Sequence, residues 1–411
     1  MQASVNNTHP VSRINEQEGS EDMFVMYNAD TMKVPVRVWL KEEKDLEKGC
    51  MEQAYHLSRL PFLHKWVSLM PDTHTGMGMP IGGVIAAKGV VIPNAVGVDI
   101  GCGMAYTETN IRVEDIKNVM TGNGSLIQAI VGDIMRNIPV GFAHHKTEMP
   151  CYTLDVAFEE MDRYEEDAEL LGQLEAGYFQ IGTLGGGNHF IELDKGTDGS
   201  MYLVIHTGSR HLGEEVAEYY TKLANSRLKE QGKGIPYYMS YLEGTDRADY
   251  MEDVQIIQKY AEWNRQIIVR EIVKGMKWKA VEQFSAEHNY LDTSGILHKG
   301  TVSARNGEKV IIPANMKEGA ILGIGKGNEE WNYSAPHGSG RKREDVKNQH
   351  TVSEFKKEMK GIYSSCIGTE TLDEAPFAYR SIKEIAEQIK DSVEVTEILK
   401  PVYNFKAGNP K

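Results

Sequence analysis

The chain has 411 residues, of which 41% are hydrophobic and 25% are charged, and this is the composition of a globular protein with a sizeable core. No stretch approaches the roughly 18–20 apolar residues that a membrane span needs, so we expect no membrane segment. The formal charge of −14 argues against a protein that coats nucleic acid along its length. It leaves open an enzyme that binds one strand end through a local basic pocket.

The four cysteines are widely scattered, which is no disulfide framework for a chain of this length. We therefore expect a reducing compartment, the cytoplasm. Residues 1–22 are polar and lack the apolar core of a secretion signal, so they are predicted to form an N-terminal extension. Residues 23–411 show no internal repeat, low-complexity linker or evident boundary, and are predicted to form a single domain.

Secondary structure is predicted to begin in residues 34–40, where aliphatic side chains fall on every second position, as in a strand. Further strands are expected at residues 81–87 and 104–108. Residues 116–138 have helical spacing, but glycines at positions 122 and 124 divide them into two expected helices. The acidic and amphipathic residues 154–178 predict a surface helix.

The second half of the chain begins with an apolar run at residues 201–206, which predicts a buried strand that ends in a histidine. Apolar residues at three-to-four spacing predict a long helix over residues 247–284, interrupted at Gly275. Strands are expected at 308–313 and 320–324, and a closing helix over 382–399 precedes a short extended tail. Strands scattered among helices without βαβ alternation predict an α+β domain of mixed sheets with surrounding helices.

Cys102 is the residue that points most directly to chemistry. It lies between two glycines, three positions after Asp99. Glycines remove side-chain bulk and allow unusual backbone angles, so another group can approach the sulfur closely. A carboxylate and a thiolate at this spacing are able to bind one metal ion.

Four histidines lie at expected strand ends or in glycine-rich turns: His189, His206, His288 and His337. Taken singly, each is more often a strand cap or a core histidine than a ligand. One carboxylate, one thiolate and three imidazoles are nevertheless too many donors for one open catalytic ion. They predict two ions that share a bridging thiolate and clamp one phosphate. Donor softness by itself favours zinc.

Phosphate chemistry is indicated separately by two glycine-rich turns, 185–188 and 337–341, whose backbone N–H groups can form anion-binding nests. The alternative is that both are only tight turns. In the second turn His337 is followed by three cations at 341–343, which are either a solvated charge run or groups that stabilise developing charge. An imidazole nitrogen is a competent nucleophile toward phosphorus, so His337 is the candidate nucleophile.

These segments together resemble the RtcB family of GTP-dependent RNA ligases. The matching motifs stand in family order and span the chain from about residue 30 to Lys406. They lie at residues 70–74, 97–103, 182–192, 206–210, 288–290, 300–305, 327–330 and 337–341. The resemblance implies an RtcB-like fold for residues 23–411 and a site with two Mn²⁺ ions per chain.

In that site, Asp99, Cys102 and His189 would hold one manganese ion, and Cys102, His206 and His288 the other, with Cys102 bridging. The resemblance further implies that His337 takes GMP from GTP as a phosphoramidate. The guanylate-binding residues that it implies are Asn188, His189, Phe190, Ile191, Glu192, His288, Asn289, Pro313, Ala314, Asn315, Met316, Ala320, His337, Gly338, Ser339, Gly340, Tyr379 and Lys406.

The implied activity joins an RNA 3′-phosphate or 2′,3′-cyclic phosphate end to a 5′-hydroxyl end, in RNA repair or tRNA splicing. Two positions depart from the family pattern. Ala320 stands where relatives often carry a serine that contacts guanine, and Met77 where some carry lysine or tyrosine. A metal-dependent phosphodiesterase that trims RNA ends without joining them is the alternative, followed by a non-catalytic sensor of RNA damage. The sequence leaves an accessory protein partner open.

Overall fold

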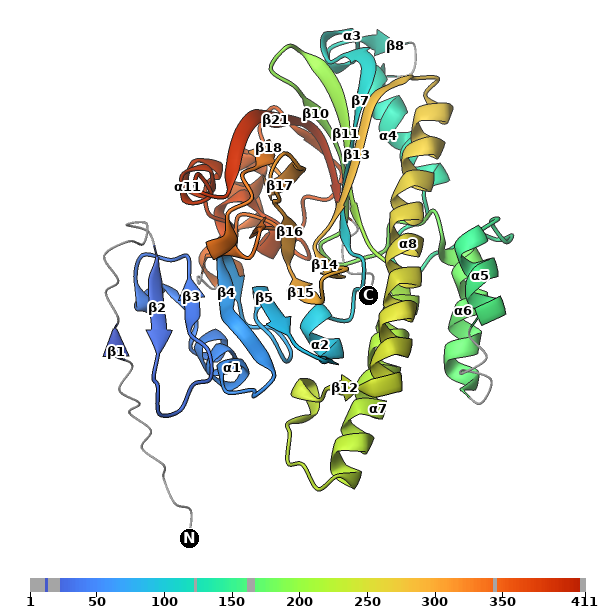
Figure 1. Ribbon diagram of the computed structural model, residues 1–411. Coiled ribbons are helices and arrows are strands. Elements are labelled where there is room, and N and C mark those ends of the chain that lie inside the picture. Colours follow the sequence, from blue (N-terminus) through green and yellow to red (C-terminus); the bar gives the residue numbers. More distant parts are fainter. Residues whose placement is uncertain (1–11, 14–22, 122–123, 161–166, 343–345, 407–411) are drawn as a thin grey trace.

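Two large curled sheets form the centre of the computed structural model, which describes residues 12–13, 23–121, 124–160, 167–342 and 346–406 (Figure 1). The smaller sheet contains, in spatial order, β1 (Ser12–Arg13), β2 (Phe24–Tyr27), β3 (Val36–Val38), β4 (Leu63–His74), β5 (Ile81–Ala87), β15 (Ile296–Lys299) and β14 (Asn289–Leu291). Within it, β3 and β4 are parallel. A parallel pair needs a crossover, and α1 (Lys48–Ser58) supplies it by burying Cys50, Ala54 and Leu57 in the core.

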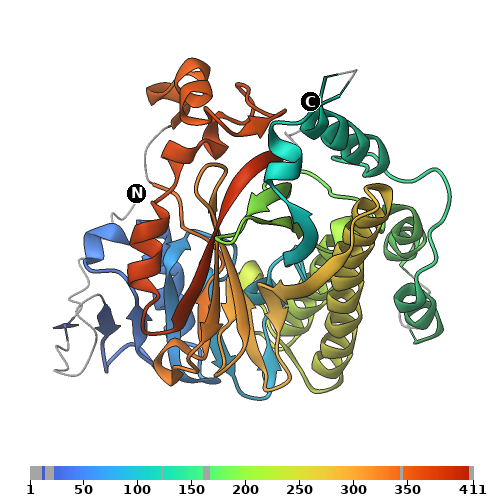
Figure 2. The same ribbon diagram turned by 90° about the horizontal axis from the view of Figure 1, so that it is seen from above.

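The larger sheet carries the strands that matter for the site. In spatial order these are β13 (Ala280–Glu287), β7 (Gly103–Arg112), β11 (Ser200–Thr207), β10 (Phe190–Lys195), β21 (Val393–Lys406), β18 (Gly319–Gly325) and β17 (Lys309–Asn315), with β20 (Tyr363–Ser364) beside β21. One apolar cluster joins Tyr106 and Phe190 from one half of this sheet to Ile311 and Leu399 from the other half. The sheet therefore folds over its own concave face (Figure 2).

The convex face of the larger sheet is covered by α8 (Gly244–Gly275) and α4 (Leu126–Asn137), whose aliphatic residues pack on those of β10 and β11. Beyond α8 lie α7 (Arg210–Glu230), α5 (Tyr152–Glu160) and α6 (Ala168–Gln180) (Figure 1). Helix α10 (Val352–Glu358) buries Phe355 in a separate apolar cluster with Met316 and Leu372. Among the described residues, no helix has both the length and the apolar character that crossing a membrane requires.

Short elements complete the described chain. They are β6 (Val90–Val91), α2 (Pro93–Val96), α3 (Glu114–Lys117), β8 (Met120–Thr121), β9 (Gly124–Ser125), β12 (Leu242–Glu243), β16 (Thr301–Ser303), β19 (Ser334–Pro336), α9 (Val346–Gln349) and α11 (Ile382–Gln388), with 3₁₀ turns at Glu43–Asp45, Tyr237–Met239, Glu329–Trp331, Leu372–Glu374 and Pro376–Ala378.

The predicted α+β class is confirmed, as are the strands predicted at 81–87, 104–108, 201–206, 308–313 and 320–324. The first predicted strand is shorter than expected and covers only Val36–Val38. Apart from Ser12–Arg13, which pair with β2, the predicted extension over residues 1–22 lies outside the described residues.

Two helix predictions were too long at their C-terminal ends. The helix expected over 247–284 ends at Gly275, and residues 280–287 form the edge strand β13. The helix expected over 382–399 ends at Gln388, and the chain then enters β21. In both cases pairing with a neighbouring strand overrides local helical spacing, because β13 pairs with β7 and residues 393–399 of β21 pair with β18.

The predicted division of residues 116–138 into two helices is confirmed, but the first helix is only Glu114–Lys117 and the paired strands β8 and β9 lie between it and α4. The prediction for residues 154–178 was wrong in its division. The single helix expected over 154–178 is two helices, because α6 begins anew at Ala168. Asp167 caps α6 by accepting the Leu170 N–H at 3.1 Å, and residues 161–166 lie outside the described chain.

Candidate active site

A sharp turn between α2 and β7 carries Asp99 and Cys102. Gly97 (φ 98°) and Gly101 (φ 71°) adopt the left-handed backbone region that favours glycine. At Gly101 a side chain is excluded as well, because an added Cβ would lie 2.8 Å from Ala261 Cβ on α8. The turn can therefore press against α8 and bring both ligand side chains to the end of β7.

The three histidines come from the same edge of the larger sheet. His206 lies near the end of β11 and His288 directly follows β13, while His189 directly precedes the antiparallel β10. In this sheet the spatial order is β13–β7–β11–β10, so the ends of four adjacent strands meet. Strand register places His206 opposite both Met104 and Phe190. The sheet thus gathers side chains that are distant along the chain.

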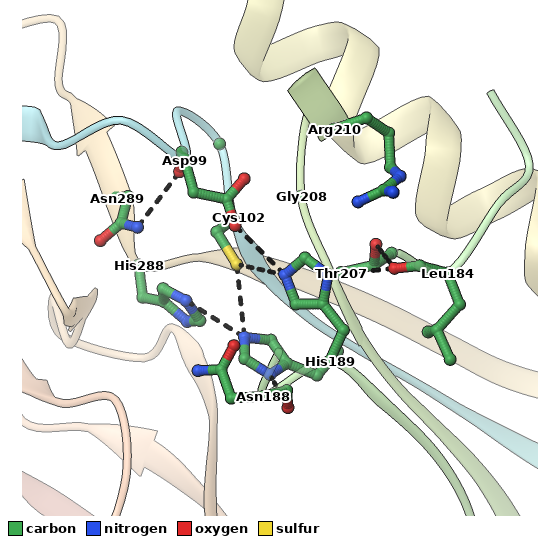
Figure 3. A network of polar contacts seen from close by, with 12 residues as sticks. Asp99, Cys102, Leu184, Asn188, His189, Thr207, Gly208, Arg210, His288 and Asn289 are labelled. Carbon is green, nitrogen blue, oxygen red and sulfur yellow. Dashed lines mark hydrogen bonds and ion pairs between the residues drawn. The ribbon is translucent and has the colours of Figure 1, made fainter. Parts of the chain in front are cut away.

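Two triads result, and Cys102 belongs to both (Figure 3). In one, His189 Nε2 lies 3.1 Å from Asp99 Oδ2 and 3.5 Å from Cys102 Sγ. In the other, His206 Nε2 lies 3.3 Å from Cys102 Sγ and 3.4 Å from His288 Nε2. Among the described residues, these two sets are the ones whose donor atoms all lie within 4.8 Å of one another.

Backbone carbonyls fix the orientation of two of the imidazoles. His189 Nδ1 lies 3.0 Å from the carbonyl oxygen of Leu184, and His206 Nδ1 lies 3.2 Å from that of Asn188. A proton on Nδ1 leaves the Nε2 lone pair directed at the centre, which is the arrangement of metal-binding histidines. Burial, followed by neighbouring imidazoles, lowers the pKa of His206 and His288 well below the usual range, so both rings are neutral.

The donor set fits a pair of metal ions. Burial and then Asp99 raise the pKa of the Cys102 thiol. Burial acts to raise the pKa of Asp99 as well, but the neighbouring His189 side chain outweighs it and holds this pKa at about 2. Asp99 Oδ1 and His288 Nδ1 are buried and have no hydrogen-bond partner among the described residues. An array of lone pairs with no matching protons is costly to bury unless cations enter it.

His337 stands beside this centre, just after β19. Its ring centroid lies 5.0 Å from that of His288. Its Nδ1 lies 2.7 Å from Oδ2 of Asp72, so a carboxylate faces the ring on that side. Asp72 is fully buried, and the same oxygen accepts the Gly338 N–H at 3.1 Å. The carboxylate favours a proton on Nδ1 and leaves Nε2 as the free nitrogen.

One cavity of about 830 Å³ joins these groups, which is within the roughly 300–1,000 Å³ range of small-molecule sites. His337 and four of the five triad residues, Asp99, Cys102, His206 and His288, border it at one end. At the other end Glu374 accepts hydrogen bonds from Lys406 Nζ (2.5 Å) and the Tyr379 hydroxyl (2.6 Å), and it also pairs with Arg341. Burial alone would raise the pKa of Glu374, but Lys406 and then Arg341 lower it, so this end holds a buried ionic cluster.

Comparison with known proteins identifies the arrangement. The family model of the tRNA-splicing ligase RtcB matches residues 53–407. The chain belongs to the RtcB family. It is 30% identical to the RNA-splicing ligase RtcB of Escherichia coli K12, over 92% of this chain and 98% of that relative. It is also 28% identical to the tRNA-splicing ligase RtcB of Nanoarchaeum equitans (86% and 91% covered) and 26% identical to that of Pyrobaculum aerophilum (86% and 90%).

Most of the residues that the RtcB resemblance implies for guanylate binding border the cavity. These are Asn188, Phe190, Glu192, His288, Asn289, Pro313, Ala314, Asn315, Met316, His337, Gly338, Ser339, Gly340, Tyr379 and Lys406. His189 is buried behind the metal-ligand edge. Ile191 faces away, because alternate residues of β10 point to opposite faces and Ile191 packs in the convex core.

Ala320 is the third of the implied guanylate-binding residues that does not border the cavity. It is fully buried in the apolar cluster on the concave face of the sheet, and its neighbour Gly319 borders the cavity instead. The loss of a serine there is consistent with apolar packing. Met77, the other departure, is 42% exposed on the cavity rim.

Lys299 is a residue of this RtcB-family site that sequence reasoning missed. It borders the cavity, and its Nζ donates to the carbonyls of Met77 (2.5 Å) and Asn94 (2.9 Å). Burial lowers its pKa to about 7. Its place directly before the 300–305 motif was the available signal. Glu374 was missed as well, because only the fold brings it to Lys406.

Proposed function

We propose that this chain is a GTP- and Mn²⁺-dependent RNA ligase that joins a 3′-phosphate or 2′,3′-cyclic phosphate end to a 5′-hydroxyl end through a GMP–histidine intermediate. The observation that carries the proposal is the shared cavity, which is large enough for a nucleotide and is bordered both by His337 and by ligands of the two metal-binding triads. Membership of the RtcB family supports RNA as the substrate class. We place the activity in residues 23–411.

The chain's own groups account for the first step. The free Nε2 of His337 attacks the α-phosphorus of GTP, so an N–P bond forms as the bond to the pyrophosphate oxygen breaks. Asp72 stabilises the positive charge that the ring acquires, since its carboxylate lies 2.7 Å from Nδ1. Lys406 supplies a cationic donor at the border of the same cavity, and Lys299 Nζ supplies a second donor there.

The later steps use the guanylate as an activating group. The RNA 3′-phosphate takes GMP from His337, and the 5′-hydroxyl oxygen then attacks that phosphorus and expels GMP. The metal ions, held by Asp99, Cys102 and His189 and by Cys102, His206 and His288, would supply Lewis-acid stabilisation of phosphate charge. Thiolate with imidazole also suits zinc, so manganese rests on the family resemblance.

The four cysteines are free, which is consistent with action in the reducing cytoplasm.

The test of the proposal is incubation with GTP labelled at the α-phosphate in the presence of Mn²⁺. We expect an acid-labile guanylate adduct and ligation of defined RNA ends, both abolished in His337→Ala. His211→Ala is the control, because that imidazole is exposed and pairs only with acidic residues of its own helix.

The alternative function is a phosphodiesterase that opens the cyclic phosphate without joining strands. It needs the metal ligands but not His337. Opening of a cyclic phosphate in wild type without any adduct or ligation would favour it and refute the ligase proposal.

A further inference from the structure

Helix α8 passes under the metal-binding edge of the sheet with two adjacent polar residues, Asn264 and Arg265, both fully buried. Neither borders the cavity. A fully buried arginine is rare unless an anion pairs with it. Among the described residues Arg265 makes no close ion-pair contact, although the charge of Glu287 acts on it, and its Nη2 has no hydrogen-bond partner. The burial of Asn264 and Arg265 side by side therefore calls for an explanation beyond packing.

Arg265 bonds to the segments that carry four of the five metal ligands. Its Nη1 donates to the carbonyl of Gly101 (2.7 Å), in the turn between Asp99 and Cys102, and to that of Thr207 (3.1 Å). Thr207 directly follows His206 in the chain. The Nε of Arg265 donates to the Oγ of Ser285 (2.9 Å), which lies three residues before His288 in the chain.

Asn264 holds the remaining ligand segment. Its Oδ1 accepts the N–H groups of Gly182 (2.7 Å) and Thr183 (3.2 Å), and its Nδ2 donates to the carbonyls of Thr183 (3.2 Å) and Gly208 (3.1 Å). Leu184 directly follows Thr183, and its carbonyl oxygen lies 3.0 Å from His189 Nδ1. Asn264 therefore fixes the backbone that orients His189 (Figure 3 shows this carbonyl beside the ring).

We propose that Asn264 and Arg265 are positioning residues, a brace on α8 that sets the spacing of the ligand segments so that two ions can share Cys102. The inference rests on the metal centre of the proposed function and extends it to residues outside the cavity. Backbone carbonyls that face the buried guanidinium are held at one distance from each other, because its planar fork presents its N–H groups in fixed directions.

The test uses Arg265→Lys, which keeps the charge but replaces the fork with one ammonium group that cannot reach all three partners. Purified protein is loaded with Mn²⁺ and freed of excess metal, and bound manganese and its electron paramagnetic resonance spectrum are measured. We expect wild type to hold two ions with a spin-coupled spectrum, and Arg265→Lys to hold one or fewer with only an uncoupled signal. Arg270→Lys, on the exposed side of the same helix, is the matched control and should equal wild type.

The thermal midpoint of the metal-free proteins separates folding from metal assembly. If Arg265→Lys fails to fold, Ser285→Ala removes one brace contact while leaving both carbonyl bonds. We expect it to fold and to weaken Mn²⁺ binding by about three- to tenfold, the effect of one hydrogen bond. A coupled pair in folded Arg265→Lys, or unchanged Mn²⁺ affinity in Ser285→Ala, would overturn the brace alone. A wild-type chain that holds no coupled pair would overturn the proposed metal centre and the brace with it.

Discussion

Replacing Asp72 with asparagine isolates the charge that faces His337. The asparagine side chain has the same shape, and its oxygen can still accept the Gly338 N–H that Asp72 accepts at 3.1 Å. What is lost is the negative charge 2.7 Å from His337 Nδ1. That charge stabilises the ring proton while Nε2 forms a bond to phosphorus, so the variant should form the guanylate adduct more slowly.

The size of the effect follows from the contact. Once the ring acquires its charge, the Nδ1–H group and the carboxylate form a charge-assisted contact, and hydrogen bonds to charged groups contribute about 1.5–3 kcal/mol. Because about 1.36 kcal/mol corresponds to a tenfold change in rate, Asp72→Asn should slow adduct formation by about 10- to 160-fold. Mn²⁺ stoichiometry should not change, since Asp72 belongs to neither ligand triad.

The assay is single-turnover transfer of label from GTP to protein at saturating GTP. Asp292→Asn serves as a control, because Asp292 is also a largely buried carboxylate but pairs with Arg305 and does not border the cavity. A transfer rate in Asp72→Asn within twofold of wild type would refute the reasoning and leave Asp72 with a purely structural role at the end of β4.

Three further outcomes are expected. Cys102→Ser should reduce bound manganese to less than one ion per chain, because both triads lose a ligand. His189→Asn should retain one ion, because only one triad loses a ligand. Elemental analysis measures the bound manganese, and equal losses in the two variants would contradict the shared ligand. Glu374→Gln removes the anionic anchor of Lys406 and should raise KM for GTP by about tenfold with little change in the maximal adduct rate. Burial holds the pKa of Lys299 near 7, below its unfolded value, so the unfolded chain binds the extra proton above pH 7 and stability rises with pH. Chemical denaturation should show Lys299→Met losing about 2 kcal/mol of that rise between pH 7 and 9, and an identical rise in the variant would exclude this lysine as its source.

Local patterns predicted the strands well and the helix ends poorly. Residues 81–87 and 201–206 were predicted as strands because buried strands leave continuous apolar runs that survive without context. Residues 393–399 have spacing compatible with a helix, and only pairing with the edge of β18 decides that they form the first half of β21. Secondary structure at such positions is decided by partners that lie outside any local sequence window.

The sequence by itself determined which side chains are chemically competent: a thiol between glycines, and histidines at strand ends. Tertiary structure alone decided that they meet, because Cys102 is separated by 87 residues from His189 and by 104 from His206, and no local spacing spans such distances. It also decided the roles of Arg265, Lys299 and Glu374, whose partners come from remote strands and turns. Burial is the physical reason, since removing the water around a polar group changes its pKa and makes an unpaired polar group costly.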